Sequence, residues 1–207
     1  MREQEIKNII FDLGGVIINL KPAKTIAAFA RLSGLNEEEV AQKYLHDEPF
    51  KKYEKGLISD EEFRSYLKNI TGCDNDQELD DAWNAMLLDV PQERLELLKD
   101  LRKHHKLFLL SNTNDIHLKC FTEILERENN CSIDQFFDHV YYSHQMHKRK
   151  PDADIYEQVL NEQQLVPEET LFIDDNADNI DGAANLGIQT IHITGETTIM
   201  EVFDEGE

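Results

Sequence analysis

The chain has 207 residues, of which 40% are hydrophobic, and a formal net charge of −21 at pH 7. This length fits one medium-sized domain or a domain with an insertion, and the apolar content suffices for a sizeable core. The charge argues against nucleic acid as a partner, because nucleic-acid binding needs a surplus of cations, and against an anionic membrane surface. Charge of this size mainly serves solubility, and an anionic substrate would need local cations that outweigh the overall field.

The cellular setting is indicated by the chain's start and by its cysteines. Residues 1–7 are charged and lack the apolar stretch of a signal peptide, and no apolar run approaches the ~20 residues that a membrane span needs. Cys73, Cys120 and Cys131 have no metal-binding spacing and are expected to be reduced thiols. We expect a cytoplasmic protein, present as a monomer or a weak homodimer.

The first strand signal ends in a carboxylate. Residues 9–11 form a short apolar run typical of a buried parallel strand, and Asp12 follows directly. Open α/β sheets build their sites at the carboxyl ends of strands, and Gly14 and Gly15 allow the backbone to turn and to approach a ligand closely. Taken alone, this pattern fits a polar turn at the end of a strand equally well.

Helical signals replace strand signals between residues 20 and 88. Asn36 and Ser59 are each followed three residues later by a glutamate, which is the capping pattern of a helix start. Phe63 and Trp83 lie at helical spacing and are expected in the core of this segment. The pattern predicts an all-helical insert of roughly four helices.

Four further strands alternate with helices in the rest of the chain, at residues 106–110, 139–142, 170–173 and 188–193. This alternation predicts an α/β fold with a Rossmann-like parallel sheet and helices on both faces. We expect residues 1–19 and 89–207 to form this core domain, and residues 20–88 to form a helical cap inserted into it.

Right-handed connections bring the carboxyl ends of all parallel strands to one edge of the sheet. Asp12, Ser111, Lys150 and the pair Asp174–Asp175 should therefore converge. Carboxylates at such a short distance from one another either raise each other's pKa or require a cation between them. A hard divalent ion such as Mg²⁺ fits oxygen ligands. Mg²⁺ would attract a phosphate, which Lys150 and Ser111 can bind, and Asp12 can then act as the nucleophile.

Basic and imidazole groups near residue 150 also have simpler interpretations. Lys150 belongs to a run of three cations, residues 148–150, and such runs are usually solvated. His144 and His147 lack carboxylate support for a metal site and are expected in a surface loop.

Four short motifs follow one another along the chain: residues 11–16 (FDLGGV), 110–114 (LSNTN), 149–151 (RKP, with Ile155 and Tyr156 after it) and 172–176 (FIDDN). In sequence and order they resemble the motifs of the haloacid dehalogenase (HAD) superfamily, and the helical insert lies where that superfamily carries its cap. Residues 53–59 (YEKGLIS) resemble a recurrent stretch of this cap. Residues 174–180 (DDNADNI) are most similar to the bacterial α-glucose-1-phosphate phosphatases.

The resemblance implies a Mg²⁺-dependent phosphatase that acts on a small phosphate ester such as a sugar phosphate. Asp12 matches the nucleophile and a metal ligand, and the Gly14 carbonyl matches a second ligand. Asp175 matches the acidic metal ligand of the last motif, with Asp174 beside it, acting through water.

The resemblance also implies a phosphate-binding set. Ser111 and Asn112 match the residues that bind the phosphate. Lys150 matches the lysine that steadies both the nucleophile and the phosphate.

One position departs from the usual pattern of these phosphatases. Most of them carry a general-acid aspartate two residues after the nucleophile, where this chain has Gly14. A positioned acid is worth ~10²–10⁴-fold in rate. Two alternatives therefore stay open: a dehalogenase-type hydrolase, which would not need Asp174 and Asp175, and a binder of phosphorylated ligands that has lost turnover.

Overall fold

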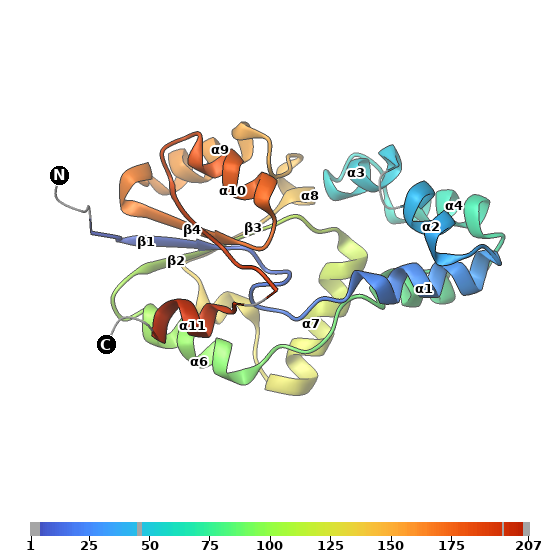
Figure 1. The fold of residues 1–207 in the computed structure, drawn as a ribbon, viewed down its shortest axis with the longest axis horizontal. Coiled ribbons are helices and arrows are strands. Elements are labelled where there is room, and N and C mark those ends of the chain that lie inside the picture. Colours follow the sequence, from blue (N-terminus) through green and yellow to red (C-terminus); the bar gives the residue numbers. More distant parts are fainter. Residues whose placement is uncertain (1–4, 45–46, 196, 205–207) are drawn as a thin grey trace.

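A five-stranded sheet forms the centre of the molecule in the computed structural model, which describes residues 5–44, 47–195 and 197–204 (Figure 1). All neighbouring strands are parallel, in the order β3-β2-β1-β4-β5. The strands are β1 Asn8–Phe11, β2 Lys106–Ser111, β3 His139–Tyr142, β4 Thr170–Asp174 and β5 Gln189–His192. The predicted Rossmann-like α/β fold is confirmed.

Helices cover both faces of this sheet. One face packs on α6 Gln92–Leu101, α7 Asp115–Asn129 and α11 Ile199–Asp204, and the other on α9 Ala153–Gln163 and α10 Ala177–Ala184. Short connections are α8 Ser143–Met146 and the 3₁₀ turns Ile133–Phe136 and Pro167–Glu169. No helix in the described part of the chain is long and apolar enough to cross a membrane. Residues 1–4, at the start of the charged N-terminal stretch, lie outside the described residues.

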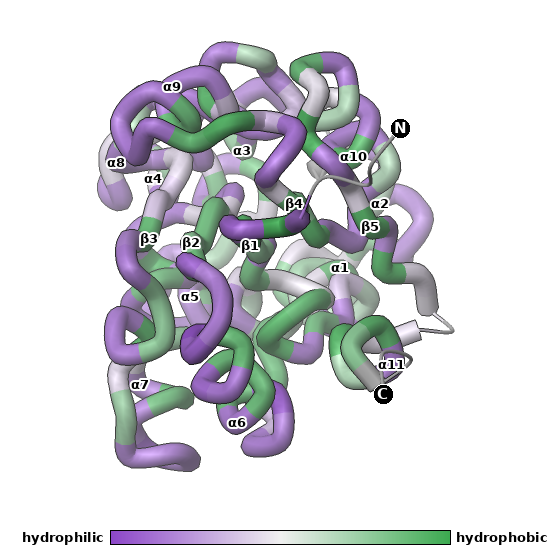
Figure 2. Tube along the Cα trace, turned by 90° about the vertical axis from the view of Figure 1, so that its left-hand side faces the viewer, coloured by the Kyte–Doolittle hydropathy of each residue, from purple (hydrophilic) through white to green (hydrophobic). Residues whose placement is uncertain are grey.

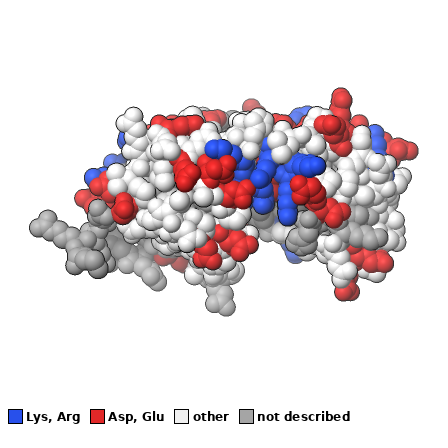
Figure 3. All heavy atoms as spheres, turned by 90° about the horizontal axis from the view of Figure 1, so that it is seen from above, with Lys and Arg blue, Asp and Glu red and all other residues white. Residues whose placement is uncertain are grey.

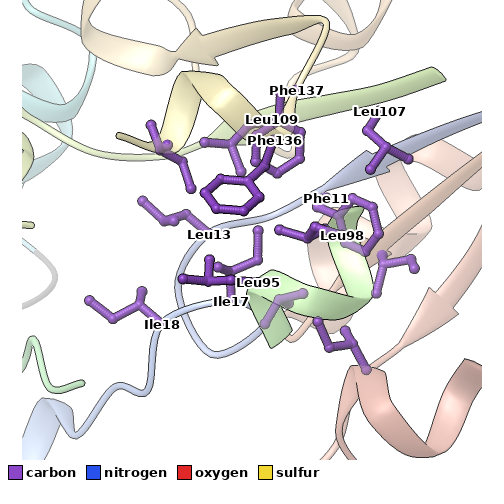
Figure 4. Packing of buried hydrophobic residues seen from close by; sticks show 14 of the residues in the cluster. Phe11, Leu13, Ile17, Ile18, Leu95, Leu98, Leu107, Leu109, Phe136 and Phe137 are labelled. Carbon is purple, nitrogen blue, oxygen red and sulfur yellow. The ribbon is translucent and has the colours of Figure 1, made fainter. Parts of the chain in front are cut away.

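Side chains of the strands β1 to β4 alternate between two apolar cores. In β1, Phe11 packs with Leu98 and Phe137 on the α6 side, whereas Ile10 packs with Tyr156 on the α9 side. Figure 4 shows Phe11, Leu98 and Phe137 gathered between the sheet and α6. Figure 2 shows hydrophobic stretches along β2 and β4 at the centre and hydrophilic stretches on outer turns of α9. Because the central strands are buried on both faces, they form continuous apolar runs in the sequence.

The described residues of the insert, 20–44 and 47–88, contain five helices, one more than the rough count from the sequence. They are α1 Pro22–Ser33, α2 Glu37–Tyr44, α3 Glu48–Glu54, α4 Asp60–Thr71 and α5 Asp76–Asn84. Helices α1 and α3 have no side-chain cap, since neither Lys21 nor Asp47 makes a cap bond, and each instead carries a proline at its first or second position. Ser59 caps α4 as predicted, and Phe63 and Trp83 are buried in the core of the insert.

Two chain segments join the insert to the sheet and run side by side. The Asn19 backbone exchanges hydrogen bonds with the backbones of Leu88 and Asp89, both 3.0 Å long, and Leu20 pairs with Leu87. We propose that the chain divides into its two domains at this crossing, with the sheet domain made of residues 1–19 and 89–207 and the cap of residues 20–88.

Candidate active site

A cavity of about 320 Å³ opens at the carboxyl edge of the sheet, beneath the insert. Asp12 follows β1 at this edge, Ser111 ends β2 and Asp174 ends β4. The predicted site residues that line the cavity are Asp12, Gly14, Ser111, Asn112, Lys150 and Asp175. Asp174 is completely buried next to them. The topology thus brings all seven predicted residues together.

Lys150 is 1% exposed and lies between two carboxylates. Its Nζ donates to Asp12 Oδ1 and to Asp174 Oδ2, both at 2.6 Å. Burial opposes the ammonium charge, but the two carboxylates outweigh it, so the pKa of Lys150 is raised. The interpretation of Lys150 as a solvated lysine is therefore wrong, because the paired carboxylates compensate for the loss of water.

Asn112 holds the backbone of Lys150 in place. The Asn112 Nδ2 donates to the Lys150 carbonyl at 3.0 Å, and the Lys150 N–H donates to Asn112 Oδ1 at 2.9 Å. This reciprocal pair joins the end of β2 to the segment that carries the lysine. It fixes the position from which the long Lys150 side chain reaches Asp12.

Three carboxylates form a compact cluster around Lys150. Oxygen atoms of Asp12, Asp174 and Asp175 lie within 4.8 Å of one another. Burial and the neighbouring carboxylates raise the pKa of Asp12 to about 7, against the opposing effect of Lys150. Burial, and next the charge of Asp174, also raise the pKa of Asp175.

This cluster fits a divalent cation. When ionised, the three carboxylates and the one ammonium of Lys150 leave two negative charges, and the ligand atoms are the hard oxygens that Mg²⁺ prefers. The buried oxygens of Asp174 are fixed by Lys150, by the Asn179 amide at 3.0 and 3.1 Å, and by the Asn176 N–H at 2.8 Å. Asp12 and Asp175 both line the cavity.

The two glycines after β1 have different roles. Gly15 has φ +71°, and a Cβ there would overlap the Asp175 carboxylate, so only glycine lets the backbone pass so close to the cluster. Gly14 lines the cavity outside the left-handed region, and a Cβ there would come within 2.6 Å of the end of the Leu20 side chain and 3.9 Å of Asp12 Oδ2. The conformational constraint therefore lies on Gly15.

Two ionisable residues of the cavity wall were not identified from the sequence as site residues. Glu54, at the end of α3, receives hydrogen bonds from Arg149, which directly precedes Lys150. Burial raises the pKa of Glu54, against the charges of Arg149 and Lys150. A signal was present, since Glu54 lies in the 53–59 stretch and Arg149 in the 149–151 motif, but their contact depends on the docking of the insert.

His117 is a further wall residue that the sequence did not indicate. It lies in the first turn of α7, stacks on Trp83 and contacts Asn84 Oδ1 through Nδ1 at 2.9 Å. Burial lowers the pKa of His117 to about 3, so this imidazole is neutral at pH 7.

The prediction that His144 lies in a surface loop is wrong. It belongs to α8 and is 5% exposed. The end of α3 covers it: the Ser143 hydroxyl donates to the Glu54 carbonyl at 2.6 Å, and Gly56 lies directly against the His144 carbonyl. His147 is exposed, as expected.

Comparison with known proteins settles the family. A model of haloacid dehalogenase-like hydrolases matches residues 6–187. The chain belongs to the haloacid dehalogenase-like hydrolase family.

Relatives within this family include enzymes that act on phosphorylated carbohydrates. A D-ribitol-5-phosphate phosphatase from Bacteroides thetaiotaomicron is 32% identical over 188 residues, which are 89% of this chain and 90% of that protein. A phosphorylated carbohydrates phosphatase from Thermotoga maritima is 26% identical over 189 residues, which are 89% of this chain and 83% of that protein.

Among solved structures, a HAD family enzyme from Bacteroides thetaiotaomicron superposes on this chain with a TM-score of 0.89 at 36% sequence identity. The superposition covers 97% of this chain and 99% of that enzyme's chain. That enzyme has been crystallised with magnesium, and with magnesium and inorganic phosphate.

Proposed function

We propose that this protein is a Mg²⁺-dependent phosphatase that hydrolyses a small phosphorylated sugar or polyol. The observation that carries the proposal is the buried Lys150 between Asp12 and Asp174, with Asp175 beside them at the cavity. The cluster combines a candidate nucleophile, a cation for phosphate oxygens and ligands for a divalent metal. The substrates of the carbohydrate phosphatases in the family and the magnesium and phosphate bound by the related enzyme support the same assignment.

Asp12 is the nucleophile of the proposed reaction. One of its oxygens forms a bond to phosphorus while the bond between phosphorus and the ester oxygen breaks, and the departing alkoxide takes up a proton from water. Water then cleaves the aspartyl-phosphate, which releases inorganic phosphate and restores the carboxylate. Lys150 orients Asp12 through the 2.6 Å bond and offsets the negative charge that gathers around the phosphorus.

Other residues hold the metal and the phosphate. Asp12, the Gly14 carbonyl and Asp175 would hold the metal, and Asp174 would act on it through water. When bound, Mg²⁺ would supply positive charge for the phosphate dianion next to Asp12.

Two cavity residues complete the phosphate site. Ser111 donates its hydroxyl to a phosphate oxygen. Asn112 contributes to the same site by fixing the lysine backbone through its two hydrogen bonds.

Two substrates within this class differ in their leaving group. The motif resemblance and Gly14 favour glucose 1-phosphate, because an anomeric hydroxyl departs more easily than an ordinary alcohol and depends less on a general acid. The overall similarity favours a primary-alcohol phosphate such as D-ribitol 5-phosphate. The ratio of kcat/KM for these two compounds decides between them.

A screen of phosphate esters with and without Mg²⁺ tests the function itself. We expect turnover that requires Mg²⁺ and falls to near background in Asp12→Asn, which keeps the shape but loses the anionic oxygen. Metal-independent release of halide from 2-haloacids would instead identify a dehalogenase. Binding of phosphate esters without any turnover would identify a ligand-binding protein.

A further inference from the structure

The insert contributes one charged side chain to the described wall of the cavity. The other insert residues of the wall are Leu20, Phe50, Trp83, Met86 and Leu87, all apolar or aromatic. The Trp83 N–H already donates to Asn114 Oδ1 at 3.4 Å. Glu54 is therefore the group through which the described part of the insert can accept hydrogen bonds from a molecule in the cavity.

Arg149, which belongs to the sheet domain and also lines the cavity, holds Glu54 in place. The Arg149 Nε and Nη2 lie 3.0 and 2.9 Å from the same oxygen, Glu54 Oε2. Among the described residues, no protein group donates a hydrogen bond to Glu54 Oε1. About a quarter of each side chain is exposed, so the pair is neither fully solvated nor sealed from the cavity.

The charges of this pair suit a position next to the organic part of a phosphate ester. A lone carboxylate would repel a phosphate dianion, but Arg149 balances Glu54, and the cations Lys150 and Lys51 also act on it. The phosphate end is assigned to the sheet edge, at Asp12 and Lys150. The organic part must then extend toward the insert, where Glu54 lies.

The cations that act on Glu54 belong to a strongly acidic molecule, with a formal net charge of −21. Figure 3 shows Lys and Arg side chains gathered in the middle of one face, between Asp and Glu side chains.

We propose that Glu54, positioned by Arg149, is the specificity residue that accepts hydrogen bonds from hydroxyl groups of the substrate's organic part. This inference rests on the proposed phosphatase function and identifies a polyhydroxylated leaving group as the preferred class. A hydroxyl donating to a carboxylate is a charge-assisted hydrogen bond, and a site built around such an acceptor discriminates against analogues that lack the hydroxyl.

The test compares two five-carbon phosphates, D-ribitol 5-phosphate and n-pentyl phosphate, which differ in their hydroxyl groups. The quantity measured is the ratio of kcat/KM for the two substrates, in the wild type and in Glu54→Ala. We expect the ratio to fall by about 10- to 100-fold, the worth of a hydrogen bond to a charged group. Arg149→Met should lower the ratio in the same direction, because Glu54 loses the partner that holds it.

Lys55→Met is the matched control. Lys55 also forms an ion pair between the end of α3 and the sheet domain, with Asp152 at 2.9 Å, but neither residue lines the cavity. We expect this variant to keep the wild-type ratio. If Glu54→Ala lowers kcat/KM equally for both phosphates, or if Lys55→Met changes the ratio as much, Glu54 only docks the insert and the proposal is wrong.

Failure of the proposed function gives a different result. A wild type that hydrolyses neither compound would contradict the phosphatase assignment. In that case, the binding of ribitol 5-phosphate is measured by calorimetry for the wild type and for Glu54→Ala. Tighter binding to the wild type supports the role of Glu54, and equal binding or no binding contradicts it.

Discussion

Replacing Lys150 with methionine tests the charge balance of the site. Methionine has a similar volume, so the change removes the ammonium and leaves the packing largely intact. The variant keeps Asp12 and the fully buried Asp174 without their shared cation. We expect a large loss of stability in the absence of metal.

The magnitude follows from the two 2.6 Å contacts. At an effective dielectric constant of about 20, each contact is worth about 6 kcal/mol of Coulomb attraction, most of which only offsets desolvation. Removing one partner of a buried ion pair costs about 3 to 5 kcal/mol in net free energy of unfolding, because a charge stays buried without a partner.

Urea unfolding at pH 7.5 with a chelator present measures this loss. With an m-value of about 2 kcal/mol/M, the midpoint should fall by about 1.5 to 2.5 M. Circular dichroism and fluorescence of Trp83, the single tryptophan, must report the same transition for the value to be meaningful.

Two further variants sharpen the comparison. Adding Asp174→Asn to Lys150→Met should recover part of the lost stability, since one of the unpaired charges disappears. Lys7→Met, which breaks an exposed ion pair with Glu169, should have little measurable effect. A Lys150→Met protein destabilised by less than about 1 kcal/mol would refute the view that Lys150 neutralises buried carboxylates.

Three other outcomes are expected. Asp175→Ala should weaken Mg²⁺ binding, measured by calorimetry, and abolish most hydrolysis, while its circular dichroism spectrum stays native. Unchanged metal affinity would show that Asp175 is not a metal ligand. Gly14→Asp should fold, because the close contact of the new Cβ is with the movable end of Leu20. It should raise kcat/KM for glucose 6-phosphate relative to glucose 1-phosphate by supplying an acid. A wild type that already prefers the 6-phosphate would contradict this explanation of Gly14. His117 has a pKa of about 3 when folded and near 6.5 when unfolded, so the unfolded state binds the proton more readily and stability falls as the pH drops below about 6.5. Lowering the pH from 7 to 5.5 should cost about 1 kcal/mol through this residue, and urea titrations of His117→Gln should show a loss smaller by that amount.

The sequence by itself determined the sheet and the edge where the site lies. Strand periodicity, the alternation with helices and the right-handed connection rule were enough to predict that Asp12, Ser111, Lys150 and the pair 174–175 converge, and the structure brings them together. These features depend on local patterns and on chain topology, both of which can be read along the chain.

Tertiary structure decided the features that depend on contacts between distant segments. The sequence did not reveal that Lys150 is buried, because its environment consists of Asp12, 138 residues away, and Asp174. It also missed the Glu54–Arg149 pair and misplaced His144, since both depend on how the end of α3 docks on α8. Burial and pairing of polar groups arise from packing between elements, and no periodicity within a single element encodes them.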